Sequence, residues 1–577
     1  MEFHSQLDSA GGAAGSRLIL LLVMVWLPGS GFSQAAPSTT DTISEIKQLY
    51  DVGRWSEVVQ AAPETAGESA DLEFYRGLAL SQLQRWGEAR AAFQAGLARD
   101  PRDTRFLAEL AGIAYRQKQF SNAKRELRHA LAINSRDDYV NNFLASIYFL
   151  EDNLEAALKY WNRTGRPQLT DLTFDPPPKL NRLLLDRAFA FTPRTEWRRD
   201  QYLATQAKLS ALDLFPRMRF DLEAQPDGSF DLGFHAAERD GWGNSKLEGI
   251  VSLLRGSAYQ SIYPEFYNLD RGGLNWRSLI RWDSQKRRVF TEIAAPLEEN
   301  PSIHYYVYFD ARNENWNLTN TLLPSRSSPA YLNLEKATAG ARIQFIEPGP
   351  WQWNAGVEYS YRNFRNLTAL PGQVGSDFTN GSAIALRSGV ERSLVRIPER
   401  RFTLDANAAA ELGTFFSNPL GKYGRIEGSL TANWFPKARG EDYKMKADLK
   451  GGRTFGNVPF DELFVVGFDR DNDLWLRGHS ALRNGQKGDA PLGRNFLLVN
   501  WEMDKIAYQG AFFTVKVGPF LDSGKISDPS GYFGSPKFLW DTGLQAKIRV
   551  LGSIEFVLGY GKDLRAGNNS FYTNVSR

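Results

Sequence analysis

The chain has 577 residues, a formal net charge of only +3 and no cysteine. This length predicts several domains, and the interspersed acids and bases give no argument for binding nucleic acid. The missing cysteine excludes disulfides, thiolate metal sites and cysteine nucleophiles, and a mean hydropathy of −0.40 is too polar for a bundle of membrane helices.

The first 35 residues have the pattern of a secretory signal peptide. Arg17 precedes the apolar run 18–27, and the small residues Ser33-Gln34-Ala35 follow after a Pro-Gly-Ser step. The apolar run is about half the ~20 residues that a membrane-spanning helix needs. We therefore expect residues 1–35 to be removed, with a mature chain that begins near Ala36 outside the cytoplasm. The alternative is an N-terminal membrane anchor.

Residues 70–165 repeat with a period of 34, within a predicted repeat domain at 43–165. Three sets of positions carry the phase: Ala89, Ala123 and Ala157; the large residues Phe93, Leu127 and Trp161 four positions later; and the small residues Gly77, Ala111 and Ala145 twelve positions earlier. Small residues let the two helices of a hairpin approach closely, and large ones fill the groove to the next hairpin. The pattern resembles tetratricopeptide repeats, with residues 43–60 as a degenerate first hairpin. Such arrays bind peptides or partner proteins. The alternative is a plain helical bundle.

A linker and a small module follow the repeats. Residues 166–180 contain three consecutive prolines and are predicted to be a stiff linker. Within 181–240, "LLLDRAFAF" is expected to be a strand and 195–215 a helix, and alternating residues on both sides of Pro226-Asp227-Gly228 predict a hairpin. Strand, helix and hairpin together resemble a POTRA domain, the periplasmic module that precedes certain outer-membrane barrels. A generic α+β spacer is the alternative.

From residue 243 to the end, helical periodicity gives way to about sixteen segments of roughly ten residues that alternate apolar and polar side chains. Aromatic residues gather near the segment ends. With the signal peptide, this predicts a sixteen-stranded antiparallel transmembrane β-barrel, wide enough to hold water or a plug. The first and last strands are expected at 246–254 and 570–576, with Lys246 and Phe571 at a lateral seam. The alternative is a soluble multi-sheet domain.

One long loop interrupts the strands. Roughly forty residues separate the strand that ends near 455 from the strand at 496–504, and loops of this size are usually functional or disordered. In the strands on the far side, apolar residues alternate with Glu502 and Asp522, so these carboxylates should face the lumen. The planar fork of Arg477, in the loop, can bridge both. Gly478 lets the backbone approach the wall. The alternative is three separately solvated charges.

The same residues resemble motifs of the outer-membrane assembly factor superfamily, which includes BamA, TamA, the two-partner secretion transporters and the patatin-linked barrels. The loop motif is Leu476-Arg477-Gly478-His479, and the strand motif is Phe520-Leu521-Asp522-Ser523-Gly524. The resemblance covers about residues 183–577. It implies that Arg477 pairs with Asp522 and, less directly, with Glu502. Two features depart from the family: His479 replaces an aromatic residue, and the chain ends in Val575-Ser576-Arg577 instead of a terminal aromatic.

Nothing in the sequence predicts an enzyme. There is no G-x-S-x-G motif, no phosphate loop and no pair of histidines at ligand spacing, so we expect no cofactor and no metal. The resemblance implies a bacterial outer-membrane protein that inserts proteins into that membrane or moves them across it. Its partners would be the lipid bilayer, client polypeptides, and a periplasmic protein or lipoprotein at the repeats. The alternatives are an exopolysaccharide export porin and a passive tether.

Overall fold

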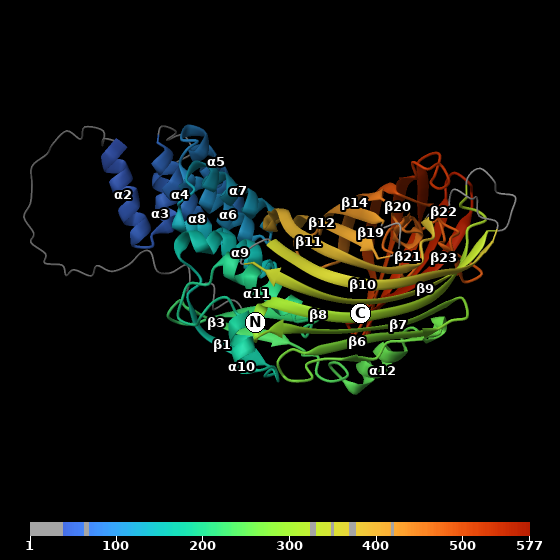
Figure 1. Cartoon of the computed structure of the whole chain (residues 1–577). Helices are drawn as coiled ribbons and strands as arrows, with labels where there is room; N and C mark the ends of the chain where they lie inside the picture. Colours follow the sequence, from blue (N-terminus) through green and yellow to red (C-terminus); the bar gives the residue numbers. More distant parts are fainter. Residues whose placement is uncertain are drawn as a thin grey trace, which may run out of the picture. The chain divides into compact units, whose positions relative to one another are not determined.

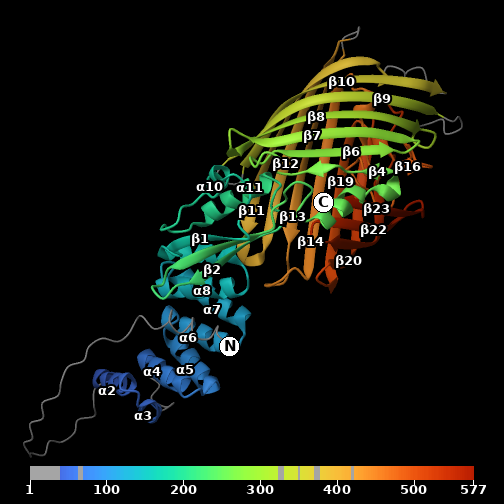
Figure 2. The ribbon, with the colours of Figure 1, turned by 90° about the horizontal axis from the view of Figure 1, so that it is seen from below.

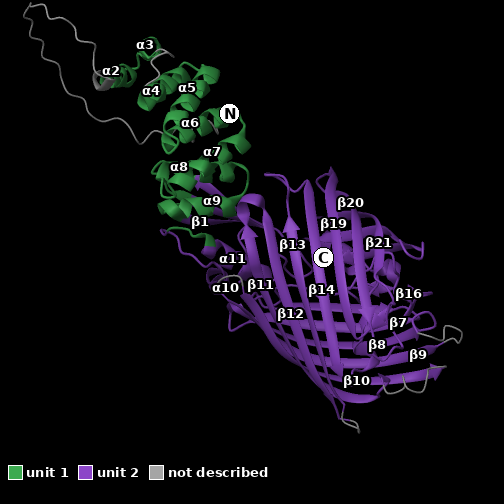
Figure 3. Ribbon diagram, turned by 90° about the horizontal axis from the view of Figure 1, so that it is seen from above, with its two compact units in different colours: residues 1–170, 196–199, 224–230 green, residues 171–195, 200–223, 231–577 purple. Residues whose placement is uncertain are grey.

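The computed structural model describes residues 39–62, 69–322, 330–347, 351–368, 377–416 and 421–576. The expected signal peptide lies outside these residues. The chain forms two compact units, drawn in two colours in Figure 3. Unit 1 contains residues 1–170, 196–199 and 224–230, and unit 2 contains residues 171–195, 200–223 and 231–577.

Unit 1 is a series of helices that confirms the 34-residue period. The helices are α2 (Thr39–Asp51), α3 (Trp55–Ala61), α4 (Ala70–Gln82), α5 (Trp86–Arg99), α6 (Thr104–Arg116), α7 (Phe120–Ile133), α8 (Asp138–Leu150) and α9 (Leu154–Trp161). From α6 onward, each helix begins 34 residues after its counterpart in the preceding hairpin. The expected degenerate hairpin at 43–60 corresponds to α2 and α3.

Side-chain size explains why the repeat keeps its phase. Ala89, Ala123 and Ala157 are fully buried, one in the second helix of each hairpin. Gly77 is packed so tightly that a Cβ there would lie 2.4 Å from a ring carbon of Phe93. The small residues therefore set how closely the helices approach each other, as the sequence predicts.

The small module contains β1 (Leu169–Asp175), α10 (Arg182–Ala188), α11 (Arg199–Ala211), β2 (Met218–Ala224) and β3 (Phe230–Ala236), with the sheet order β1-β3-β2. Two predictions for this region are wrong. The expected linker contains strand β1, and the expected strand "LLLDRAFAF" begins as helix α10. Asn181 explains the helix, because its side chain accepts a hydrogen bond from the Leu183 N–H as an N-cap. The expected helix and hairpin are confirmed as α11, β2 and β3.

The remainder of unit 2 is a closed barrel (Figure 1). Fourteen described strands of eight or more residues form most of the ring: β6 (Asn275–Trp282), β7 (Lys286–Leu297), β8 (Asn300–Asn317), β9 (Tyr331–Ile346), β10 (Trp351–Thr368), β11 (Gly381–Ile397), β12 (Phe402–Phe415), β13 (Lys422–Trp434), β14 (Tyr443–Gly456), β19 (Asn495–Gln509), β20 (Phe513–Ser527), β21 (Leu539–Val550), β22 (Ile554–Asp563) and β23 (Asn569–Ser576). Each pairs antiparallel with the next, and β14 pairs with β19 across the long loop.

The start of the barrel differs from the prediction. Residues 246–254, the expected first strand with Lys246 at the seam, form helix α12 (Lys246–Leu254). The next stretch contributes only the two-residue strands β4 (Ser261–Ile262) and β5 (Glu265–Phe266), which pair with β6. In the ring, β4 neighbours β23, which carries Phe571. The expected count of sixteen strands is therefore not confirmed.

The barrel has the reverse polarity of a water-soluble sheet. In β10, Val357, Tyr359 and Tyr361 are 43–48% exposed, whereas the alternating Glu358, Ser360 and Arg362 are buried. The same alternation appears in β19 and β20, where Leu497, Val499, Val517 and Leu521 are exposed. The outside of the ring is thus apolar and the inside polar, as the sequence predicts. Within the described residues, no helix combines the length and the apolar character that crossing a membrane requires.

Candidate functional site

The candidate site is built on the segment 457–494 between β14 and β19, which we call the arginine loop. Its short elements are η5 (Phe460–Glu462), β15 (Phe464–Val465), β16 (Leu482–Arg483), β17 (Gln486–Lys487) and β18 (Leu492–Gly493). Strand β15 pairs with β18, and β16 pairs with β17. These pairings give the loop an internal frame instead of leaving it as one open excursion.

Apolar packing holds one side of this frame against the wall. Leu476, next to the arginine, is fully buried. It belongs to a cluster that joins the loop residues Phe464, Val466, Leu474 and Leu476 to the wall residues Phe496, Leu498 and Ile526. Burial of this cluster fixes the backbone just before Arg477, so the guanidinium is presented from a rigid support.

Arg477 makes contacts with three consecutive strands. Its Nη2 lies 2.6 Å from Asp522 Oδ1 and its Nε lies 2.9 Å from Asp522 Oδ2, so the guanidinium binds this β20 carboxylate in a bidentate manner. Its Nη1 donates to Glu502 Oε2 of β19 at 2.7 Å and to Gln545 Oε1 of β21 at 3.1 Å. The structure therefore brings the loop residue Arg477 together with Glu502 and Asp522, the two carboxylates that strand register predicted to face the lumen.

Burial makes this contact more demanding than a surface ion pair. The Arg477 side chain is 4% exposed and that of Asp522 is 0% exposed. The Arg477 backbone N–H also donates to Asp522 Oδ2 at 2.9 Å, and the guanidinium carbon lies 4.0 Å from the centre of the Phe520 ring. A buried carboxylate of this kind has no water to replace a lost partner.

Glycines permit the close approach of loop and wall. A Cβ on Gly478 would lie 2.6 Å from Asp541 Cγ and 2.8 Å from the backbone N of Asp563. Gly561 in β22 faces the loop from the other side, where a Cβ would lie 2.2 Å from the Arg477 carbonyl oxygen. Gly524 is less constrained, because its nearest neighbour would be Leu498 at 3.2 Å. The sequence interpretation named Gly478 and Gly524 and missed Gly561.

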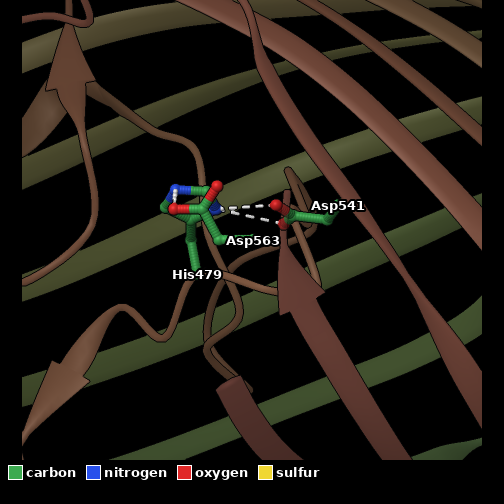
Figure 4. A group of neighbouring side chains, drawn as sticks. All are labelled: His479, Asp541 and Asp563. Carbon is green, nitrogen blue, oxygen red and sulfur yellow. Dashed lines mark hydrogen bonds and ion pairs between the residues drawn. The ribbon is translucent and has the colours of Figure 1, made fainter. Parts of the chain in front are cut away.

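His479 lies between two carboxylates, as Figure 4 shows. Its Nδ1 is 3.0 Å from Asp541 Oδ1, and its Nε2 is 3.3 Å from Asp563 Oδ2. Burial works to lower the pKa of His479, but the hydrogen bond and charge of Asp541, together with the charge of Asp563, outweigh it and raise the pKa above its ordinary value. His479, which departs from the aromatic residue of the family motif, thus adds two ion pairs between the loop and the wall.

The same three side chains could hold a metal ion. One donor atom from each of His479, Asp541 and Asp563 lies within 4.8 Å of the others. Both ring nitrogens, however, already face a carboxylate each, and Asp541 Oδ2 also accepts from the Gly478 N–H at 2.6 Å. This arrangement favours a charged imidazole between two acids over a cation bound by one nitrogen.

The opposite side of the arginine loop is fixed by a second group of ion pairs. Asp471 Oδ2 lies 2.6 Å from Arg281 of β6, and its Oδ1 lies 2.9 Å from Arg288 of β7. Burial alone raises the pKa of Asp471, but Lys286, Lys487 and the two arginines lower it well below its usual range. The loop is therefore anchored on two separate stretches of wall, β6–β7 and β19–β22.

A third anchor uses the two acids of η5. Asp461 lies 2.8 Å from Lys336 of β9 and 3.2 Å from Arg362 of β10, and Glu462 contacts the same two cations at 2.7 and 3.2 Å. The sequence interpretation missed both this anchor and that of Asp471. The acids flanking the arginine were visible as "FDRDND" and "FDE", but nothing in the chain showed which strands they would meet.

Between the loop and the wall there remains a polar cavity of about 670 Å³. Charged side chains from strands β7 to β13 line it, among them Arg288, Arg312, Glu358, Arg387 and Glu411, with loop residues on the other side. Loop residues and wall residues therefore line a charged space together.

Comparison with known proteins gives one family match and several similar structures. The profile of the tetratricopeptide repeat family matches residues 80–147. Among solved structures, the chain is similar to BamA from Haemophilus ducreyi lacking POTRA domains 1-3, at 11% identity and a TM-score of 0.42, over 71% of this chain and 84% of that one. It is also similar to CdiB from Escherichia coli, at 11% identity and 0.47, over 71% and 76%.

CdiB from Acinetobacter baumannii gives 11% identity and a TM-score of 0.42, over 71% of this chain and 73% of that one. No curated protein matches the sequence.

Proposed function

We propose that this protein is an outer-membrane β-barrel of the assembly and secretion factor type, which inserts proteins into the outer membrane or moves them across it. The observation that carries the proposal is the arginine loop, held inside the barrel by Arg477 on Asp522 and Glu502. We assign the protein no catalytic role and no cofactor.

The polarity of the ring supports a place in the membrane. A wall that exposes Val357, Tyr359 and Tyr361 to its surroundings and buries Glu358 and Arg362 within it is suited to lipid outside and water inside. A closed ring also leaves few backbone groups unpaired in hydrocarbon. The outer membrane is the bilayer in which barrels of this kind occur.

The arginine loop supports a gated role over a simple pore. The loop bridges the interior through buried charge pairs on β6–β7, β9–β10 and β19–β22. Buried ion pairs add little net stability but define one arrangement, because any misplacement leaves a charge unpaired. A loop fixed in this way stabilises one state of the barrel, and its release would create another.

The N-terminal parts would act in the periplasm. The module with sheet order β1-β3-β2 is the candidate POTRA domain, and an unfolded client could add to its edge strand β2 through main-chain hydrogen bonds. The helical repeats would bind a client or a partner lipoprotein.

The two alternatives predict different interiors. An exopolysaccharide export porin should have an open lumen lined by acids and aromatics without an inserted loop, and the loop anchored by Arg477 argues against it. A passive tether is compatible with a permanently plugged barrel. Only the consequences of losing the protein separate the tether from an assembly factor.

The test is quantitative proteomics of outer-membrane and culture-medium fractions from a strain lacking the protein. We expect particular barrels or secreted proteins to disappear, and to return with the wild-type chain or with Arg483→Ala, an exposed position on the same loop. Arg477→Ala should not restore them although it is present in the membrane. An unchanged protein profile in the deletion strain would overturn the proposal and favour polysaccharide export or a tether.

A further inference from the structure

Helix α12 (Lys246–Leu254) stands where the first barrel strand was expected. Ser245 caps it by accepting a hydrogen bond from the Glu248 N–H at 3.1 Å, and Glu248 Oε2 accepts from the Asn244 N–H at 2.9 Å. This pairing of Ser and Glu satisfies free N–H groups at the start of the helix, close to a capping box. The helix is thus a locally encoded element, not a distorted strand.

The polarity of α12 is inverted relative to a helix packed on a water-soluble protein. Leu247, Ile250 and Leu254 lie on one face at spacings of three and four residues, and they are 58%, 54% and 48% exposed. On the opposite side, Glu248 and Ser252 are 2% and 1% exposed. In water, burial of the leucines and solvation of the glutamate would be favoured.

The buried polar face connects both sides of the junction between the first and last strands. Glu248 Oε1 accepts a hydrogen bond from Ser553, in the turn between β21 and β22, at 2.6 Å. Ser252 donates to Glu265 of β5 at 2.9 Å, and Arg255 pairs with the same carboxylate at 2.6 Å. In η2 (Ser257–Tyr259), the Tyr259 hydroxyl bonds Thr573 of β23.

The exposed face of α12 is continuous with the apolar outside of the barrel. Gly249 packs against Trp242, whose ring stacks edge-on with Phe266 of β5 at 4.9 Å. Phe266 in turn stacks on Trp276 of β6 at 5.3 Å. Trp276, Ile280 and Trp282 are the outward residues of β6, and Figure 1 shows α12 beside this strand.

On its other side α12 faces the last strands. In Figure 2 the green helix lies between β6 and the red strands β22 and β23. Leu558 of β22 is 48% exposed and Phe571 of β23 is 83% exposed. The outward apolar surface therefore runs from β6 across α12 to β23 without a polar break in the named residues.

We propose that α12 forms part of the barrel wall, with Leu247, Ile250 and Leu254 in contact with the acyl chains of the bilayer. The inference rests on the proposed membrane barrel and adds that the junction between β23 and β4 is sealed by a helix. Strand β4 has only two residues, so backbone pairing contributes little at this junction. A helix can fill the space because its own hydrogen bonds satisfy its backbone in lipid.

Acyl chains fit this face better than a client strand does. A strand needs free N–H and C=O groups to pair with, whereas α12 offers only side chains at this face. A lipid headgroup is also a poorer fit, because Arg255 is already paired with Glu265 and the exposed face is made of three aliphatic residues. The ligand is therefore hydrocarbon, not phosphate or peptide.

The test uses the absence of native cysteine. Single variants Ile250→Cys and Leu254→Cys of the full chain are spin-labelled and reconstituted in phosphatidylcholine vesicles, and collision with oxygen and with a water-soluble nickel chelate is measured. Leu386→Cys, an outward position of β11 that is 62% exposed, reports whether the barrel itself lies in lipid. Asn484→Cys in the arginine loop reports an aqueous site.

We expect the ratio of oxygen to nickel collision at Ile250 and Leu254 to match that at Leu386 and to exceed that at Asn484. Suppose that Leu386 is in lipid but that both helix positions have the ratio of Asn484 or collide with neither reagent. The inference about α12 is then wrong, whereas the proposed membrane barrel is supported. If Leu386 also has the ratio of Asn484, the proposed membrane barrel fails as well. The second helix position keeps the test decisive if one variant does not fold.

Discussion

Replacing Arg477 by alanine should release the arginine loop from the wall while leaving the ring intact. The change removes the two-armed contact with Asp522 and the contact with Glu502, at distances of 2.6 to 2.9 Å. Asp522, which is 0% exposed, would then remain buried without its main cation. Breaking a buried pair by removing one partner costs about 3–5 kcal/mol.

Hydrogen exchange read by mass spectrometry measures this loss directly. The Arg477 and Gly478 N–H groups donate to Asp522 and Asp541, so they exchange only when the docked loop opens. Because about 1.4 kcal/mol corresponds to a tenfold change in an equilibrium constant, the peptide 474–481 should exchange at least about a hundredfold faster. Arg483→Ala should leave this peptide unchanged.

Two further variants test the reasoning behind the magnitude. Arg477→Lys keeps the charge but loses the fork, so it should fall between wild type and alanine. The double variant Arg477→Ala/Asp522→Ala no longer contains the unpaired carboxylate. The loss of loop-docking free energy in this double variant should therefore be clearly smaller than the sum of the losses in the two single variants. The idea that this pair docks the loop would be refuted if peptide 474–481 exchanged at the wild-type rate in Arg477→Ala. It would also be refuted if the free-energy losses of the two single variants added strictly to that of the double variant.

Three other perturbations follow from the same contacts. Folding raises the pKa of His479, so its stabilisation of the loop should be complete below its unfolded value and be lost as pH rises through the folded value. After correction for intrinsic rates, the exchange rate of peptide 474–481 should therefore change as pH rises through this range, and His479→Gln should abolish that change. If the change persists in His479→Gln, another group titrates. Replacing residues 467–490 by a short Gly-Ser linker should raise single-channel conductance in planar bilayers well above that of wild type, and equal conductances would mean that the loop does not fill the lumen. In the repeats, Gly77→Ala should cost about 1–3 kcal/mol in urea unfolding because its Cβ meets Phe93, whereas Gly112→Ala, with open space around it, should gain up to about 1 kcal/mol; equal effects would contradict the packing argument.

The parts of the fold that could be predicted are those with long, regular periods. The 34-residue phase of Ala89, Ala123 and Ala157 specified three hairpins, because burial of small residues at fixed steps has few other solutions. The strand β6 begins and ends where the alternating segment "NWRSLIRW" does. Where many residues repeat one pattern, errors at single positions do not change the result.

The predictions from short apolar runs were wrong, because two runs expected to be strands contain helices α10 and α12. Nine residues from Lys246 fit a strand or one face of a helix about equally well, and such runs cannot be decided by periodicity alone. The deciding signal was local: Ser245 and Glu248 have the spacing of a capping box. Likewise Asn181, one residue before α10, marked a helix start that the apolar content of the segment concealed.

In the candidate site, too, some residues could be predicted from the sequence and others could not. Strand register was enough to point Glu502 and Asp522 inward, and their charge called for a cation such as Arg477. The partners of Asp471 and Glu462 depend instead on the path of a loop of roughly forty residues across the barrel. Contacts as far apart in the chain as Arg281 and Asp471 carry no periodic signal, so only the folded structure reveals them.

The distribution of charge explains why the loop docks in one orientation. Where the loop meets β6–β10 it presents acids, Asp471 and Glu462, to wall arginines and lysines. Where it meets β19–β22 it presents cations, Arg477 and His479, to wall acids. A loop turned the other way would set like charges against each other at several buried points, and each such juxtaposition is costly. Lys487 on Glu314 is an exception to this polarity, and it lies within 4.0 Å of Asp469 of the loop itself. Buried charges that add little net stability can therefore still fix the position of the loop, and releasing one side would weaken the alignment of the other.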